Sequence, residues 1–166
     1  TEQIAIGDCL AIAALNKKKF SKKHYKLLHP NGSIGNQLKT TEDLMISKSG
    51  IPFINENTTM KKALGVITKK KLGVLIVRDG KKNTVGLISD GDLRRSNLKR
   101  GNLKELKVKY VMTKNPLSVD KDTLAAKSLA IMSDNKITSL CVHKNKNKKR
   151  TIGILHIHHI LNANIQ

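Results

Sequence analysis

The sequence predicts an α/β fold (α+β) made of two β-α-β-β-α repeats related by pseudo-twofold symmetry. The first observation is an internal repeat, in which residues 62–77 align with residues 127–142 at an offset of 65. A second pair of segments, 85–89 and 152–156, aligns at an offset of 67. The two additional residues fall in polar connections, where hairpin loops tolerate insertions. Repetition of this kind indicates that one supersecondary unit occurs twice.

Each repeat is expected to begin with an extended segment followed by an amphipathic helix. The extended segments are residues 52–54 and 117–119. Apolar side chains then recur at i, i+4 and i+7, a spacing typical of one helix face. These positions are Met60, Leu64 and Ile67 in the first repeat and Ala125, Leu129 and Met132 in the second. Residues that commonly cap helix N-termini precede both stripes, namely Thr58 or Thr59 and Asp122.

A hairpin and a second helix are expected to complete each repeat. Two β-branched runs separated by a polar turn are typical of a hairpin. The runs are residues 74–77 and 85–89 in the first repeat, and 139–142 and 152–156 in the second. The closing helices begin near Asp90 and near Ile157.

Residues 1–40 lie outside the repeat. Residues 4–15 have a largely apolar helical pattern, and residues 21–28 predict a second short helix that ends at His29-Pro30-Asn31-Gly32. We interpret this region as the end of a domain whose remainder lies upstream. The chain is therefore predicted to contain three parts, residues 1–40, 41–105 and 106–166.

The charge of the chain is strongly basic and comes mainly from lysine. The 166 residues include 32 Lys plus Arg against 12 Asp plus Glu, a formal charge of +20, and only five of the basic residues are arginines. With no tryptophan and few other aromatic residues, specific recognition of nucleic acid is not expected. The lysine clusters 17–26, 61–71 and 144–150 are read as solvated faces. An alternative is a lysine-rich module that binds anionic polymers.

Membrane and secreted classes are excluded by other features. No apolar stretch approaches the roughly 20 residues that span a bilayer, and no signal peptide pattern is present. Two cysteines, Cys9 and Cys141, make no disulfide framework and fit a cytoplasmic location. Cys141 is expected to be a buried strand residue.

The start of the second helix in the first repeat carries the main candidate site. Ser89 and Asp92 follow Gly86 in the run Gly86-Leu-Ile-Ser-Asp-Gly-Asp92. A carboxylate can accept two ribose hydroxyls, while a hydroxyl and backbone N–H groups at a helix N-terminus can bind phosphate. The alternative is that Ser89 caps the helix and Asp92 complements its dipole.

This run resembles the Gly-x-x-Ser/Thr-x-x-Asp motif of tandem cystathionine-β-synthase (CBS) domains. Together with the runs Asp90–Arg95, Gly153–His158 and Leu28–Leu38, the whole chain is similar to arabinose 5-phosphate isomerases of the sugar-isomerase (SIS) family. The resemblance implies a tandem CBS-domain pair, residues 41–105 and 106–166, preceded by the helical tail of an SIS domain. Asp90 joins Gly86, Ser89 and Asp92 in the implied effector site.

The resemblance also implies an activity for the parent protein. Members of the family interconvert ribulose 5-phosphate and arabinose 5-phosphate for Kdo and lipopolysaccharide biosynthesis, and no cofactor is required. His29 falls at the family's catalytic histidine. Because the other catalytic groups would lie upstream, this chain is expected to be inactive alone.

A regulatory role follows from the same resemblance. The pair is expected to bind a nucleotide-type effector such as CMP-Kdo, AMP or ATP and to form homo-oligomers, with a CBS-pair dimer and a tetrameric parent. A purely structural oligomerisation module is the alternative. No specific nucleic acid and no membrane partner is expected.

The equivalent site in the second repeat differs chemically. His156 stands in the place of Ser89, and His159 stands in the place of Asp92. By analogy, Pro116, Thr138 and Ser139 would line this site. A neutral imidazole does not bind a ribose diol as a carboxylate does, so the second site is expected to be empty or to take another ligand.

The four histidines 143, 156, 158 and 159 lack an acid or thiol at ligand spacing, and no metal site is predicted.

Overall fold

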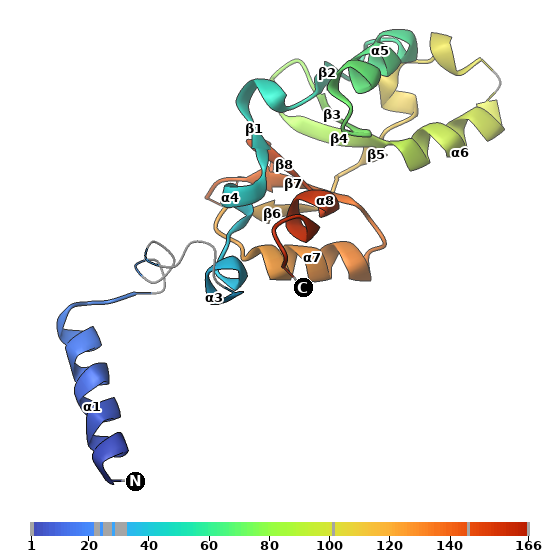
Figure 1. Ribbon diagram of the computed structural model, residues 1–166. Coiled ribbons are helices and arrows are strands. Elements are labelled where there is room, and N and C mark those ends of the chain that lie inside the picture. The colour runs from blue at the N-terminus through green and yellow to red at the C-terminus, as the bar shows by residue number, and fades with distance from the viewer. Residues whose placement is uncertain are drawn as a thin grey trace. The chain divides into compact units, whose positions relative to one another are not determined.

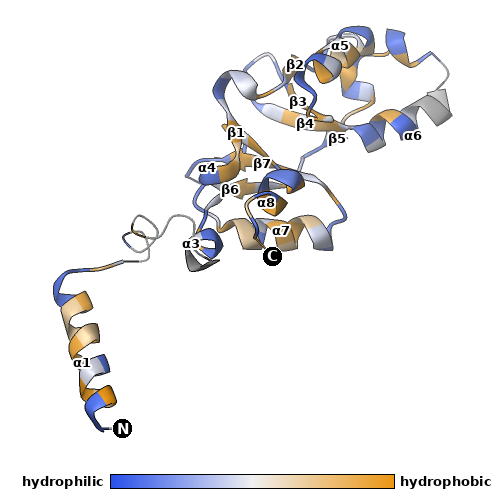
Figure 2. Cartoon of the chain, viewed as in Figure 1, coloured by the Kyte–Doolittle hydropathy of each residue, from blue (hydrophilic) through white to orange (hydrophobic). Residues whose placement is uncertain are grey.

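The segment before the repeats forms a unit of its own. The computed structural model describes residues 2–21, 24, 28, 33–100, 102–145 and 147–165, and the chain divides into residues 1–39 and 40–166. The first unit contains helix α1 (Glu2–Lys17) and helix α3 (Ser33–Gln37). No residue of α1 is buried, although much of the helix is apolar (Figure 2). Most of the helix predicted over residues 21–28, and His29, lie outside the described residues.

The two predicted repeats are confirmed, in the predicted order of elements (Figure 1). Repeat 1 consists of β2 (Phe53–Asn55), α5 (Met60–Lys70), β3 (Val74–Arg78), β4 (Thr84–Ser89) and α6 (Asp90–Arg100). Repeat 2 consists of β6 (Ser118–Asp120), α7 (Ala125–Asp134), β7 (Ser139–His143), β8 (Gly153–His156) and α8 (Ile157–Leu161). In each repeat the first strand is parallel to the second, and the second is antiparallel to the third.

Two short strands, which the sequence pattern does not reveal, complete the sheets by exchange. Strand β1 (Ile46–Ser47) precedes repeat 1 but pairs with β8 of repeat 2. Strand β5 (Thr113–Lys114) precedes repeat 2 but pairs with β4 of repeat 1. The sheet orders are therefore β2-β3-β4-β5 and β1-β8-β7-β6. Helix α4 (Thr41–Leu44) and three 3-10 turns, Lys48–Gly50, Leu103–Glu105 and Val108–Tyr110, lie in the connecting segments.

The core is divided by the alternation of side chains along the central strands. Leu75 and Val77 of β3 pack in one cluster with the buried face of α5. Val74 and Ile76 face the other way, into a cluster that includes Cys141 of β7 and Ile154 of β8. Because this cluster draws on both sheets, the repeats share a common core between them.

Two details of the predicted helices are corrected by the structure. Helix α7 begins at Ala125 with Leu124 as its N-cap, so Asp122 is not the cap. Asp122 lies instead in the turn after β6, where its carboxylate is 3.4 Å from the Lys121 ammonium. In both helices the fully buried residue of the middle turn is at i+3, Ala63 in α5 and Ser128 in α7. The predicted residues at i+4, Leu64 and Leu129, lie at the edge of the buried face and are half-buried.

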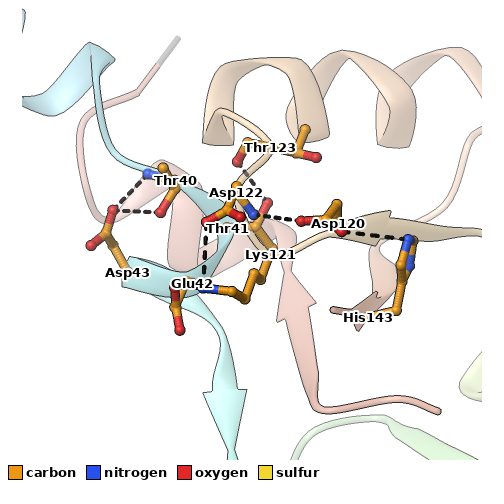
Figure 3. Close-up of polar contacts among 9 residues, drawn as sticks. All are labelled: Thr40, Thr41, Glu42, Asp43, Asp120, Lys121, Asp122, Thr123 and His143. Atoms are coloured by element: carbon orange, nitrogen blue, oxygen red, sulfur yellow. Dashed lines mark hydrogen bonds and ion pairs between the residues drawn. The ribbon is translucent and has the colours of Figure 1, made fainter. Parts of the chain in front are cut away.

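Helix α4 is attached to repeat 2 by polar contacts (Figure 3). The Thr41 N–H donates to the Thr123 carbonyl over 2.7 Å, and the Thr41 hydroxyl lies 3.0 Å from the Ser128 hydroxyl, with Thr41 and Ser128 both buried. At the surface, the Lys121 ammonium donates to the Glu42 carboxylate over 2.6 Å. The segment that leads into repeat 1 is therefore held by repeat 2.

Gly153 allows this segment to approach β8. A Cβ atom at position 153 would collide with Met45 Sδ and lie 3.1 Å from the Ile46 carbonyl oxygen. We expect Gly153→Val to lower the free energy of unfolding by about 1–3 kcal/mol, because β1 must shift. Urea denaturation measures the loss. Gly80→Ala, at a position with no neighbouring atom within 4 Å, is the control; an equal effect of both changes would contradict the prediction.

Candidate functional site

Ser89 and Asp92 form a reciprocal cap at the start of α6. The Ser89 backbone N–H and hydroxyl both donate to Asp92 Oδ2, over 2.8 and 2.7 Å. The Asp92 N–H lies 3.3 Å from the Ser89 hydroxyl oxygen, to which it donates. This is the geometry of a capping box, in which the first turn is closed from both sides. The helix-capping role considered for these residues is thus realised in the structure.

The other oxygen of Asp92 is also fully used. Arg95 donates to Asp92 Oδ1 over 2.7 Å, and the Thr113 hydroxyl donates to it over 2.9 Å. The Asp92 residue is only 6% exposed. Burial by itself raises the pKa of Asp92, but the hydrogen bonds from Ser89, Thr113 and Arg95 outweigh it and hold the pKa below its ordinary value. A ligand that approaches Oδ1 must replace Thr113 or Arg95, because both lone pairs are occupied.

Neither Arg95 nor Thr113 was predicted to belong to this site. Arg95 could have been found, because residues at i and i+3 share a helix face. Thr113 belongs to β5, whose position next to β4 follows from the exchange of strands, and no sequence signal marks it.

The remaining predicted residues of repeat 1 have supporting positions. Gly86 pairs with Lys114 of β5, and a Cβ atom there would collide with Met112 Sδ. Asp90 begins α6, and its N–H donates to the Gly73 carbonyl over 3.2 Å. Its carboxylate lies against Gly73, where an added Cβ would be 2.8 Å from Asp90 Oδ2.

Three of the predicted residues of repeat 2, Thr138, Ser139 and His156, meet at the start of α8. Ser139 and His156 are partners across β7 and β8, and the adjacent Thr138 carbonyl accepts a hydrogen bond from the Ile157 N–H over 2.9 Å. Pro116 lies two residues before β6, whose first residue, Ser118, is the partner of Cys141. In place of the Ser89–Asp92 pair, His156 Nδ1 accepts from the His158 N–H over 3.2 Å. This end of repeat 2 therefore offers imidazoles and hydroxyls but no carboxylate of its own.

The histidines make the stability of the chain sensitive to acid. Burial is the main cause that lowers the pKa of His156 and of His159, and the neighbouring His158 lowers both further, while Asp90 opposes the effect at His156. A lowered folded-state pKa means that the unfolded chain binds more protons below about pH 6.5. Stability is therefore present above this pH and is lost as the pH falls towards the folded-state values.

We expect urea midpoints to drop between about pH 7.5 and about pH 5.5, and His159→Gln to reduce that drop. The measurement is urea unfolding at both pH values. His24→Gln, an exposed position in the first unit, is the control. An unchanged pH dependence in His159→Gln would contradict this prediction.

His143 is buried at the end of β7. It is 5% exposed, its Nδ1 has no hydrogen-bond partner, and its Nε2 lies 4.0 Å from Asp120 Oδ2 (Figure 3). Within the described part of the chain, no group of three or more His, Cys, Asp or Glu residues could hold a metal ion. Cys141 is buried as predicted, and burial raises the pKa of its thiol to about 11.

Comparison with known proteins matches this architecture to one family. The model of the CBS domain matches residues 42–99 and residues 108–165. The chain belongs to the CBS-domain family. The tandem CBS pair implied by the motif around Ser89 and Asp92 is thus confirmed at the level of the fold.

Curated relatives of this chain include arabinose 5-phosphate isomerases. The enzyme KdsD of Salmonella typhi is 33% identical over 166 residues, which make up 99% of this chain and 50% of the relative. KdsD of Pseudomonas aeruginosa is 36% identical over 166 residues, with the same two shares. The chain spans about half the length of the curated relatives it matches, and it corresponds to the C-terminal half.

Solved structures similar to this chain are also CBS pairs. The CBS-domain protein ATU1752 from Agrobacterium tumefaciens has a TM-score of 0.69 at 20% identity and covers 78% of this chain and 96% of its own. CBSX2, solved in complex with AMP, has a TM-score of 0.64 at 25% identity. The match covers 75% of this chain and 95% of CBSX2. Across the described residues, no helix is long and apolar enough to cross a bilayer.

Proposed function

We propose that this chain is the regulatory CBS pair of an arabinose 5-phosphate isomerase-like protein and binds a nucleotide-type effector at the start of α6. The observation that carries the proposal is the buried carboxylate of Asp92, which stands at the acidic position of the CBS motif and is oriented by Ser89. Such a carboxylate has the acceptor geometry for two ribose hydroxyls.

The effector is proposed to replace the two donors that now occupy Asp92 Oδ1. The side chain of Arg95 is 67% exposed and can swing away, and Thr113 lies at the exposed edge strand β5. Once released, the Arg95 guanidinium remains available to a phosphate oxygen of the same ligand. Ser89 continues to hold Asp92 Oδ2, so the carboxylate keeps its orientation.

Related proteins support a nucleotide as the ligand class. CBSX2 was solved in complex with AMP, and the CBS pair of MJ0100 with 5′-methylthioadenosine and S-adenosylmethionine. For this chain we propose AMP, ATP or CMP-Kdo, which all combine a ribose with phosphate. We place the ligand in repeat 1, because His159 replaces the acid in repeat 2.

The upstream unit connects this pair to catalysis in the proposal. We assign residues 1–40 to the end of an SIS domain and His29 to its catalytic position, with residues 41–105 and 106–166 as the two CBS domains. The apolar, exposed surface of α1 supports contact with such a domain. The free cysteines support a reducing compartment such as the cytoplasm. The parent would isomerise ribulose 5-phosphate as a homo-oligomer, and this chain alone would be inactive.

Calorimetry and thermal unfolding of the chain with AMP, ATP, CMP-Kdo and S-adenosylmethionine test the proposal. A nucleotide at 100 times its dissociation constant should stabilise the chain by about 2.7 kcal/mol. Saturable binding at moderate salt is the expected result. If none of the four ligands stabilises the chain, the CBS pair is better described as a structural oligomerisation module.

A further inference from the structure

The hairpin loops of the two repeats meet at one edge of the CBS pair. Thr84 at the start of β4 and Thr151 before β8 are equivalent positions of the repeats, and the Thr84 hydroxyl donates to the Thr151 hydroxyl over 2.8 Å. The Thr84 N–H also donates to the Lys149 carbonyl over 2.7 Å. Loops separated by more than sixty residues in the sequence therefore lie side by side.

The two adjacent loops together carry many positive charges. Residues 78–84 and 144–151 hold eight lysines and arginines and a single acidic residue, Asp79. The Asp79 carboxylate already accepts the backbone N–H and the side-chain amide of Asn83, over 2.7 and 3.0 Å. We call the exposed cations of the two loops the basic edge: Lys81, Lys82, Lys144, Lys148, Lys149 and Arg150.

Arg78 extends the positive charge beneath the loops. Its guanidinium lies over the Phe53 ring, 3.1 Å from the centroid, and donates to the Thr151 carbonyl over 3.2 Å. Burial lowers the pKa of Arg78, and the nearby charge of Arg150 lowers it further. Two neighbouring guanidinium groups repel each other, so a bound anion would relieve the repulsion.

The composition of the loops decides which kind of anion fits. Residues 79–83 and 144–150 contain no apolar side chain. Protein interfaces depend on buried apolar or aromatic anchors, and interfacial membrane binding depends on an inserted apolar face. Binding to a phosphate chain needs neither, because lysines that neutralise phosphates release counterions. The one aromatic ring beneath the loops, Phe53, is half-buried, and Arg78 occupies one of its faces, so it is a poor platform for stacking a base.

We propose that the basic edge binds the phosphate chain of a linear polyanion, without reading bases. The two sources of this chemistry are inorganic polyphosphate and the backbone of single-stranded RNA. A second copy of this strongly basic chain is disfavoured at the same edge by charge repulsion. The proposal is independent of the nucleotide site at Asp92.

The test measures the affinity of the whole chain for inorganic polyphosphate, oligouridylate and polyglutamate between about 50 and 200 mM salt. The edge variant is K81Q/K82Q/K148Q/K149Q. The matched control K61Q/K62Q/K69Q/K127Q removes the same charge from exposed positions on α5 and α7. Six phosphate contacts predict a slope of log K against log salt of about −4.

We expect the edge variant to weaken polyphosphate binding by about tenfold or more and to reduce the slope, while the control changes affinity by less than about twofold. Thermal unfolding checks that both variants remain folded. Equal losses in the two variants would overturn the proposal, since affinity would then follow total charge. Polyglutamate binding as tightly as polyphosphate would also overturn it. If the chain binds oligouridylate more weakly than polyphosphate, the basic edge is assigned to inorganic polyphosphate. If the two affinities are equal, the edge accepts the phosphate chain of either polymer.

Discussion

Asp92→Ala is expected to abolish the stabilisation of the chain by its nucleotide effector. The ribose of the proposed ligand has no other buried carboxylate at the start of α6, because Asp92 is the acid that the fold orients there. The stabilisation of about 2.7 kcal/mol that the nucleotide gives at 100 times its dissociation constant should therefore disappear, and with it the rise in melting temperature. The ligand-free variant should also lose about 1–2 kcal/mol of stability, since the capping box is opened.

Thr113→Val is the matched control for this experiment. It removes a hydrogen bond from the same carboxylate but leaves the carboxylate in place. Because Thr113 competes with the ligand for Oδ1, we expect the variant to bind the nucleotide at least as tightly as the natural chain. Retained binding in Asp92→Ala, measured by calorimetry, would reduce Asp92 to a capping residue and contradict the proposed site.

Leu140→Ala and Leu75→Ala should produce the largest losses of stability. Leu140 is fully buried in the core of repeat 2, and Leu75 is fully buried at the equivalent position of repeat 1. Truncating a buried leucine typically costs about 2–5 kcal/mol. We expect Leu75→Ala and Leu140→Ala to have similar effects in urea denaturation.

The shared cluster between the sheets predicts that both variants unfold in a single transition. Ile76 of repeat 1 packs with Cys141 of repeat 2, so each repeat loses the contacts of this shared cluster when the other unfolds. Leu161→Ala, at a side chain that is 47% exposed, is the control and should cost much less. Two separate transitions in either core variant would show that the repeats are independent.

Much of the fold could be predicted because its signals are local. The helix stripe of α5, the β-branched runs of β3 and β7, and the helix starts at Asp90 and Ile157 each depend on spacing within about a dozen residues. The internal repeat strengthened every such assignment, because the same pattern occurs twice. The tandem CBS architecture was implied by a family resemblance that rests on this order of elements and on the motif at Ser89 and Asp92.

The exchange of edge strands could not be predicted in the same way. Strands β1 and β5 have two residues each, too few to show an alternating pattern. Their partners lie in the other repeat, so pairing depends on how the two sheets pack rather than on neighbouring residues. The position of Thr113 beside Asp92 follows from that packing.

The sequence by itself determined the repeats, their order of elements and the residue types at the candidate site, because periodicity and motif spacing are properties of neighbouring residues. Only the tertiary structure decided that the Thr113 hydroxyl fills the last acceptor position of Asp92 and that the loops around Thr84 and Thr151 join into one basic edge. Both depend on contacts between segments far apart in the chain, which form when the two sheets bury their shared core.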